Sequence, residues 1–275
     1  MKLIVTFFIF FILILVKIFG QSLQFEAGGR SAGLGNTNSN LKDEWSIFNN
    51  VGGISGVENG VVIFGYNRYF GIEGFDKVAA GLIHPFQFGN IGVSFFRFGD
   101  QLYSEQVVSA AFGNKIGFVN LGFRANYYQM RIEDFGTAGT LFFDLGGIVE
   151  LIPKLSFGAY ISNFTISRLN NSEKSSLPVI MKVGFSYQPV NELQLNIDLN
   201  KDVDYEPILK AGIEYLVSGK LYLRTGMNTN PFKGFFGVGI LPGRFKIDYA
   251  IGTHQFLGNS HQASVSFNYL KKHEK

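Results

Sequence analysis

The side chains best suited to acid–base chemistry at neutral pH are histidines, and this chain has four of them. One of them, His261, is preceded by Asn259 and Ser260, so a serine nucleophile with a histidine base can be drawn from consecutive residues. A catalytic triad needs partners that the fold brings together in space, and these three are only neighbours in sequence. We therefore interpret them as residues near a strand end, and the sequence predicts no catalytic residue and no enzyme.

Phosphate and metal chemistry have similarly weak support. The chain has no cysteine, which excludes disulfides, a thiol nucleophile and a cysteine-built metal site. The runs Gly33-Leu34-Gly35 and Gly237-Val238-Gly239 lack the strand–turn–helix context of a phosphate loop. Asp202, Asp204 and Glu206 fall in one predicted external loop, which is compatible with weak calcium binding but more typical of a solvated loop. The sequence predicts no cofactor and no metal site.

The composition favours strands with one apolar face. The 275 residues include 30 Phe, 12 Tyr and 34 Gly, while only 16% are charged. This length allows one large domain or two small ones. The formal net charge of +3 offers no basic surface for nucleic acid.

An apolar run near the N-terminus predicts export. Lys2 is followed by almost only apolar residues at 3–16, and then by Lys17. The run is shorter than the roughly 20 residues that span a bilayer, and it has the charged start and apolar middle of a secretory signal. We predict a signal peptide at residues 1–20 that is cleaved at its end. A retained membrane anchor is the alternative, which Lys17 disfavours.

Alternation with a period of two predicts β-strands from residue 60 onward. In residues 193–200, leucine or isoleucine alternates with glutamine, asparagine or aspartate. Successive side chains of a strand point to opposite faces, whereas a helix would scatter both sets around its circumference. On this basis we predict about fourteen strands, at 60–70, 75–85, 90–99, 102–112, 116–131, 135–152, 155–168, 178–188, 193–201, 207–216, 221–229, 232–241, 244–253 and 260–270.

Periodicity alone does not exclude a soluble β-sandwich. The lengths of the connections between strands distinguish a membrane barrel from such a sandwich. Counted from the first strand, the even connections are tight, for example Asn114-Lys115 and Pro153-Lys154, while odd ones such as 169–177 tend to be longer. Short periplasmic turns and longer external loops are typical of outer-membrane barrels. The sequence therefore predicts an all-β chain, a transmembrane up-and-down antiparallel β-barrel at residues 60–270, followed by a charged periplasmic tail at 271–275.

A membrane barrel turns its apolar faces to lipid and its polar faces to the lumen. Charged residues on the polar faces should then line the lumen, namely Arg124, Asp198, Lys210, Glu214, Arg224, Lys246 and Asp248. Tyrosines and phenylalanines near strand ends suit aromatic girdles at the two lipid boundaries, although cross-strand aromatic pairing explains any single one equally well.

The segment before the first strand carries the most specific motifs. It reads Gly-Gly-Arg-Ser-Ala-Gly-Leu-Gly-Asn at 28–36, and Asp-Glu-Trp-Ser-Ile-Phe-Asn-Asn-Val-Gly-Gly-Ile at 43–54. These runs, with 254–262 near the C-terminus, resemble the FadL superfamily of outer-membrane barrels, and its PorV/PorQ branch in particular. Val51 and Gly52 depart from that resemblance, because the family usually has Pro and Ala there.

The resemblance implies that residues 21–59 fold back into the barrel as a luminal hatch. Its expected contacts with the lumen wall come from Arg30, Asp43, Glu44, Trp45, Asn49 and Asn50. A barrel of this strand number encloses a wide space, so a plug is physically reasonable. A disordered periplasmic tail is the alternative, because Gly, Asn and Ser also mark disorder.

Two functions follow from the resemblance, both in the outer membrane of a Gram-negative bacterium. The first is an accessory or scaffold subunit of an outer-membrane complex such as the type IX secretion system, with other complex subunits and secreted protein as partners. The second is a FadL-like channel for hydrophobic small molecules. The modest length favours the first, because FadL-type channels usually build a capture groove from longer external loops. Besides membrane lipid, the expected partners are therefore complex subunits or a hydrophobic ligand.

Overall fold

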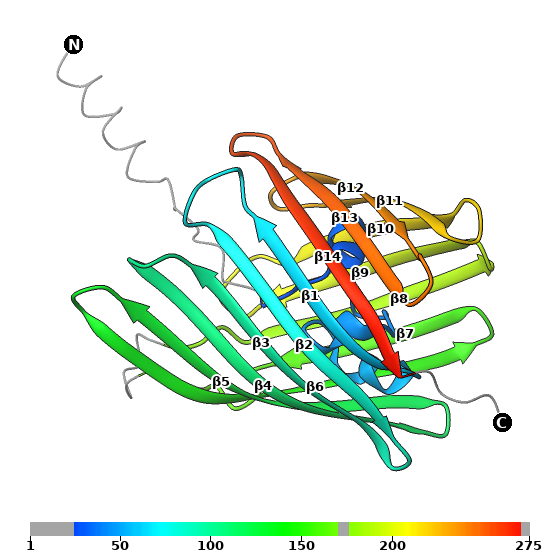
Figure 1. Ribbon diagram of the computed structural model, residues 1–275, viewed down its shortest axis with the longest axis horizontal. Helices are drawn as coiled ribbons and strands as arrows, with labels where there is room; N and C mark the ends of the chain where they lie inside the picture. Colours follow the sequence, from blue (N-terminus) through cyan, green and yellow to red (C-terminus); the bar gives the residue numbers. More distant parts are fainter. Residues whose placement is uncertain (1–24, 170–175, 271–275) are drawn as a thin grey trace, which may run out of the picture.

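The computed structural model describes residues 25–169 and 176–270, so the predicted signal peptide and C-terminal tail lie outside the described residues. Fourteen strands form a closed barrel in which sequence neighbours pair antiparallel and β1 pairs with β14 (Figure 1). The predicted all-β, up-and-down fold is thereby confirmed. The strands are β1 Gly60–Arg68, β2 Asp76–Phe86, β3 Gly89–Gly99, β4 Tyr103–Ile116, β5 Val119–Ile132, β6 Gly136–Ile152, β7 Leu155–Ser162, β8 Ile180–Val190, β9 Leu193–Asp202, β10 Ile208–Leu216, β11 Leu221–Asn228, β12 Lys233–Ile240, β13 Phe245–His254 and β14 Gly258–Leu270.

Between residue 25 and the first strand, the structure has three short helical elements. They are α2 Gly29–Gly33, η1 Glu44–Ile47 and η2 Val51–Gly56, and they lie inside the ring of strands (Figure 1). Most of their residues are buried. We call residues 25–59 the luminal segment.

The largest differences between predicted and observed strand boundaries lie at two places, while most other boundaries agree within two residues. The turn between β4 and β5 lies at Gly117 and Phe118, not at Asn114-Lys115, because Gly117 supplies the left-handed φ of 62° that this turn uses. Strand β7 ends at Ser162, although alternation predicted 155–168. The next residue, Asn163, has a φ of 54° and donates its backbone N–H to Asp144, which turns the chain out of the strand.

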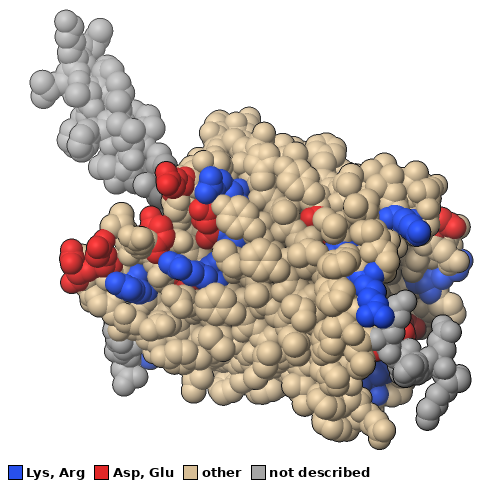
Figure 2. Space-filling model, viewed as in Figure 1, with Lys and Arg blue, Asp and Glu red and all other residues tan. Residues whose placement is uncertain are grey.

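The apolar faces of the strands point away from the barrel interior. On β5, Leu121 is 46% exposed while its neighbour Asn120 is 2% exposed, and on β9 Ile197 and Asn196 show the same contrast. A soluble sandwich would bury the apolar set, so this orientation favours the membrane barrel. Figure 2 shows the consequence, because almost all charged side chains on this face lie at the two ends, with a broad uncharged band between them.

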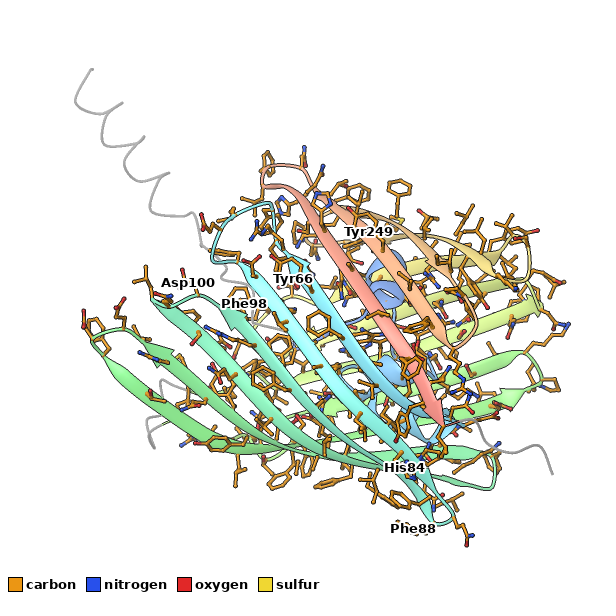
Figure 3. All side chains as sticks on the ribbon, in the orientation of Figure 1. Tyr66, His84, Phe88, Phe98, Asp100 and Tyr249 are labelled. Atoms are coloured by element: carbon orange, nitrogen blue, oxygen red, sulfur yellow. The ribbon has the colours of Figure 1, made fainter. Side chains whose placement is uncertain are left out.

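Aromatic residues occupy both edges of this band. Tyr66 lies toward one end of the barrel and donates to Asp76 at 2.6 Å, while His84 and Phe88 lie at the other end (Figure 3). The His84 ring nitrogen and the Tyr269 hydroxyl are 2.8 Å apart. Amphipathic rings of this kind suit the lipid–water boundaries.

Connection lengths assign the two ends of the barrel. The turns after β2, β4, β6 and β8 contain two residues each, and the C-terminal end of β14 lies at the same end. The opposite end carries the longest connection, between β7 and β8. Because periplasmic turns are the short ones, we take the end with β7–β8 as external. Several other external connections, after β3, β5 and β13, have only three residues.

No helix within residues 25–169 and 176–270 is long and apolar enough to cross a membrane.

Candidate functional site in the barrel lumen

A chain of buried ion pairs joins the luminal segment to the wall. Arg30 donates to both Glu214 oxygens, at 2.9 and 2.7 Å, and to Asp43 at 3.1 Å. Glu214 also accepts from Arg224 at 2.5 Å, and Arg224 donates to Asp248 at 2.7 Å. Each charge has an opposite neighbour, so removing one member would leave a buried charge uncompensated. This cluster therefore anchors α2 to β10, β11 and β13.

Asp198 on β9 holds the turn that follows α2. Its Oδ2 accepts from the backbone N–H groups of Asn38 and Ser39, at 2.7 and 2.9 Å, and its Oδ1 accepts from Ser39 Oγ at 2.5 Å. All three residues are buried. Hydrogen bonds to a carboxylate are stronger than neutral ones, so this wall residue fixes the position of the turn.

The η1 and η2 elements have their own polar attachments. Glu44 accepts from Ser266 Oγ at 2.7 Å and lies 3.4 Å from Lys246 Nζ. The Asn50 amide donates to the carbonyl oxygens of Gly147 and Ala159, at 3.2 and 3.3 Å. These contacts tie the segment to β14, β13, β6 and β7.

Close backbone packing completes the fit between segment and wall. Ten strands each turn one glycine inward against the luminal segment, and a Cβ added there would come within 2.9 Å or less of a segment atom. These glycines are Gly65, Gly92, Gly113, Gly122, Gly146, Gly158, Gly184, Gly212, Gly226 and Gly237. A side chain at any of these positions would need something to shift, so the segment is interlocked with nearly the whole circumference.

A second polar network lies on the opposite wall. Arg124 on β5 donates to Asp144 at 2.7 Å and to the Tyr160 hydroxyl at 2.7 Å, and also to the carbonyl oxygen of Ile47. Asp144 is fully buried and accepts from Ser162 Oγ at 2.7 Å as well. The guanidinium of Arg124 thus has a partner on each of its three nitrogens.

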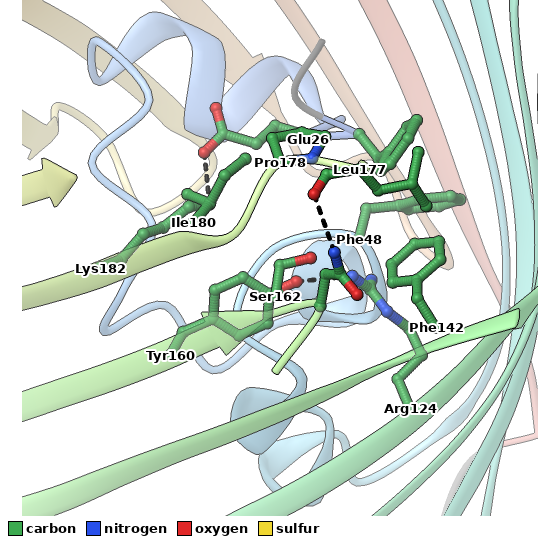
Figure 4. Close-up of a pocket in the computed structure, with 12 residues that line it drawn as sticks. Glu26, Phe48, Arg124, Phe142, Tyr160, Ser162, Leu177, Pro178, Ile180 and Lys182 are labelled. Atoms are coloured by element: carbon green, nitrogen blue, oxygen red, sulfur yellow. Dashed lines mark hydrogen bonds and ion pairs between the residues drawn. The ribbon is translucent and has the colours of Figure 1, made fainter. Parts of the chain in front are cut away.

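An aromatic pocket opens above this network, on the external side of the segment (Figure 4). Its apolar lining comes from Phe25, Phe48, Phe142, Leu177, Pro178 and Ile180. The Phe25 ring lies 5.4 to 5.9 Å from the rings of Phe96, Tyr128 and Phe142, so it occupies an aromatic box in the barrel wall. The cavity left between these side chains measures only about 20 Å³. Since a benzene-sized cavity measures about 150 Å³, the pocket is closed to ligands in this conformation.

The charges that line the pocket are neutralised within the protein. Glu26 forms ion pairs with Lys182 and, at 3.7 Å, with Lys210. Burial disfavours the charged form of Glu26, but the two ammonium groups outweigh it and lower the pKa of its carboxyl to about 2. With Arg124 paired to Asp144, the cations of this pocket have carboxylate partners, and most of its free surface is aromatic and aliphatic.

The structure places the predicted lumen-wall residues on inward faces. They are Arg124, Asp198, Lys210, Glu214, Arg224, Lys246 and Asp248. Of the predicted segment residues, those that contact the wall are Arg30, Glu44, Trp45 and Asn50. Asp43 and Asn49 differ, because their hydrogen bonds stay within the segment: Asp43 accepts from Arg30, and Asn49 donates to the Ala27 carbonyl oxygen at 3.1 Å.

Sequence reasoning assigned no site role to several residues in and beside the pocket, namely Phe25, Glu26, Lys182 and the Arg124 partner Asp144. Asp144 and Lys182 lie on polar faces of alternating strands, so the same period of two could have found them. Phe25 and Glu26 carry no periodic signal, because they precede the first strand. Only the fold brings them to the wall.

The consecutive Asn259, Ser260 and His261 do not form a triad. Ser260 Oγ accepts from the Phe70 backbone N–H at 3.2 Å, whereas the His261 ring lies on the outside of β14, 2.7 Å from the Tyr249 hydroxyl. Adjacent strand residues point to opposite faces, which keeps the two side chains apart. No group of three or more His, Asp or Glu placed to hold a metal ion occurs in the described part of the chain.

Comparisons with known proteins agree with this geometry at the level of fold. No protein family model and no curated protein matches the sequence. Among solved structures, the chain is similar to the CymD monoaromatic hydrocarbon channel, with a TM-score of 0.66, 9% identity, and coverage of 92% of this chain and 100% of that one. It is also similar to a FadL homologue of Pseudomonas aeruginosa, with a TM-score of 0.67, 10% identity, and coverage of 88% and 98%. The Pseudomonas putida toluene transporter TodX matches with a TM-score of 0.66, 12% identity, and coverage of 90% and 100%.

Barrel topology, an outward apolar belt and an occupied lumen together define the class, a plugged transmembrane β-barrel. More narrowly, its fold is similar to the folds of the FadL homologue, the monoaromatic hydrocarbon channel and the toluene transporter. The finer resemblance to the PorV/PorQ branch stays a prediction from the sequence motifs.

Proposed function

We propose that this protein is an outer-membrane channel that admits small, uncharged hydrophobic molecules. The observation that carries the proposal is the aromatic pocket at the external end of the lumen, whose cations are already paired with carboxylates of the protein. An apolar ligand gains from burial there and needs no polar partner. A carboxylate ligand would have to displace Glu26 or Asp144 from their partners. The solved barrels of similar fold, described as a monoaromatic hydrocarbon channel and a toluene transporter, support the same substrate class.

The ligand enters this pocket by replacing the ring of Phe25. That ring sits in the box of Phe96, Tyr128 and Phe142 and fills space that a ligand of similar size and chemistry would use. Binding therefore competes with an internal aromatic group. The substitution F25A should tighten the binding of an aromatic hydrocarbon, because the competing ring is gone.

The single tryptophan of the chain provides a direct readout. Trp45 is buried in the luminal segment, and its ring centroid lies 6.0 Å from that of Phe48, which lines the pocket. Toluene added to the purified protein in a non-aromatic detergent should change Trp45 emission saturably. Benzoate, of the same size but charged, should bind at least about tenfold more weakly, since its carboxylate loses water without gaining a free cation.

A matched pair of variants locates the effect. F142A removes a ring from the pocket, whereas F236A removes a ring from the lipid-facing side of β12. F142A should weaken the toluene response and F236A should leave it unchanged. Equal responses of both variants, or equal binding of benzoate and toluene, would contradict the proposed function.

The accessory role in a secretion complex rests on the motifs of the N-terminal segment. Co-purification of large partner proteins with the barrel from solubilised outer membranes would support this accessory role instead of the channel. Location in the outer membrane and cleavage of a signal peptide are part of both proposals, and mass spectrometry of the mature protein tests the cleavage.

A further inference from the structure

The outward faces of three alternate strands end in arginine at the external boundary. Arg68, Arg97 and Arg131 occupy these positions on β1, β3 and β5, and all three side chains are exposed. On β1 and β3 the outward residue just before the arginine is aromatic, namely Tyr66 and Phe95. On β5 one polar residue, Gln129, lies between Tyr127 and Arg131. Figure 2 shows basic side chains next to the uncharged band at the end that carries the β3–β4 and β5–β6 connections.

Two of these arginines are available for a ligand. Arg68 is paired with Asp76, with Nε and Oδ1 at 2.8 Å. In contrast, neither Arg97 nor Arg131 has an ion-pair partner within residues 25–169 and 176–270. Arg97 donates one bond to the backbone carbonyl oxygen of Asp100, at 3.2 Å, which leaves most of its donors open. The Asp100 carboxylate accepts from two backbone N–H groups of its own loop.

Strand register places two amides between these arginines. Arg97 pairs with Gln106 on β4, and Gln106 pairs with Gln129 on β5, two residues before Arg131. From the spacing of strands and the rise per residue, the Cα atoms of Arg97 and Arg131 are about 12 Å apart. Two arginine side chains can reach a common group across that gap. We call Arg97, Gln106, Gln129 and Arg131 the outer polar row.

We propose that the outer polar row binds a phosphate group of a phosphorylated glycolipid in the outer leaflet. Guanidinium groups bind phosphate oxygens in bidentate fashion, and the two amides add neutral donors. The row lies directly above the lipid belt, where Val108 and Tyr127 are about half exposed, so acyl chains of the same molecule have an apolar wall to pack on. A free anion would lack that second contact. The carboxylates of Glu133 and Asp134 lie in the loop beyond β5, farther from the belt.

The remaining circumference offers no comparable set among the described residues. On β6 to β14 the one cation at an outward external position is Lys201, whose ammonium donates to the Tyr205 carbonyl oxygen. The barrel thus presents one lipid-binding sector, over β3 to β5. This sector is separate from the luminal pocket, so the inference does not depend on the proposed function.

Binding of purified, diphosphorylated lipid A to the full-length chain in nanodiscs tests the proposal. Native mass spectrometry gives the bound fraction for the native protein, for the double variant R97Q/R131Q, and for the control variant R244Q. Arg244 is an exposed arginine in the connection between β12 and β13, at the periplasmic end. The double variant should bind at least about tenfold more weakly, because two charge-assisted contacts are lost. R244Q should bind like the native protein. All three substituted side chains, two in the row and one in the control, are on the surface, and retention of the barrel is checked by the heat-dependent gel mobility of each variant.

Two further arms identify what is recognised. Dephosphorylated lipid A should bind as weakly to the native protein as diphosphorylated lipid A binds to the double variant. Inorganic phosphate should not compete at millimolar concentration. Equal binding of the dephosphorylated lipid, an unaffected double variant, or full competition by inorganic phosphate would each overturn the proposal.

Discussion

Asp198 offers the sharpest test of how the luminal segment is held. Its carboxylate accepts three hydrogen bonds, two of them from the backbone N–H groups of Asn38 and Ser39. The substitution D198A removes both acceptor oxygens, and with them all three hydrogen bonds, and it leaves those two buried N–H groups without their partner. Because the segment and β9 are far apart in sequence, the loss should loosen the segment while the barrel strands keep their ladder of backbone hydrogen bonds.

The expected magnitude follows from the bonds that disappear. A hydrogen bond to a charged group contributes about 1.5–3 kcal/mol net, and each buried donor left unsatisfied costs about 1–3 kcal/mol. These values are not additive, so we expect a total of about 3–6 kcal/mol in the opening free energy of the segment. At 1.4 kcal/mol per factor of ten, this corresponds to amide exchange that is faster by about 10²–10⁴.

Hydrogen exchange followed by mass spectrometry measures this effect peptide by peptide. N196A is the matched control, since Asn196 lies two residues before Asp198 on the same inward face and accepts only from Gln194. Peptides within residues 29–57 should exchange faster in D198A, while peptides of β9 and the other strands should not change. Unchanged exchange in 29–57, or equal acceleration in the strands and in N196A, would refute the reasoning.

Three further predictions test separate parts of the architecture. L121R should cost about 2–4 kcal/mol in a membrane-folding assay, whereas N196R should be tolerated better, because the first side chain meets lipid and the second meets the polar lumen. G122V should accelerate amide exchange in η2, since a Cβ there would lie 2.2 Å from the Val51 carbonyl oxygen, while G234V, on the lipid side of β12, should not. The pKa of Glu26 is lowered to about 2, so the stabilisation that its carboxylate gives to the position of Phe25 is complete above pH 4.5, the ordinary pKa, and is lost as the pH falls toward 2. The toluene response of Trp45 should therefore strengthen below pH 4.5 in the native protein. In E26Q the response should be independent of pH.

The strand pattern was predictable from the sequence because each strand must present one face to lipid and one to the lumen. That requirement leaves a period of two in every strand, and residues such as Leu121 and Asn120 reveal their faces without any knowledge of their neighbours. The turn between β4 and β5 was misplaced for a local reason. Asn114-Lys115 and Gly117 are all typical turn residues, and only the pairing of Ile116 with Val119 selects between them.

The luminal contacts were harder to predict because they join residues far apart in sequence. Arg30 and Glu214 were both expected to face the lumen, but nothing in the sequence pairs them with each other. The inward glycines are a clearer case. In a single sequence, Gly158 or Gly226 is simply a weak strand residue, and its role emerges only when Ser39 or Gly35 is placed against it.

The arrangement of these contacts constrains how the segment reaches the lumen. Polar anchors and glycine contacts join it to every strand of the barrel, including β2, where Lys77 donates to the Glu26 carbonyl oxygen at 3.2 Å. Closure of the barrel pairs β1 with β14 and leaves a wall interlocked with the segment at ten glycines, where even one methyl group has no room. Entry of the whole segment into a finished barrel would have to break most of these contacts together. We therefore expect the luminal segment to fold with the barrel, and ligand entry to involve only its external edge at Phe25 and Glu26. The contacts there are side-chain rings, one carboxylate, and one backbone carbonyl oxygen that accepts from Lys77.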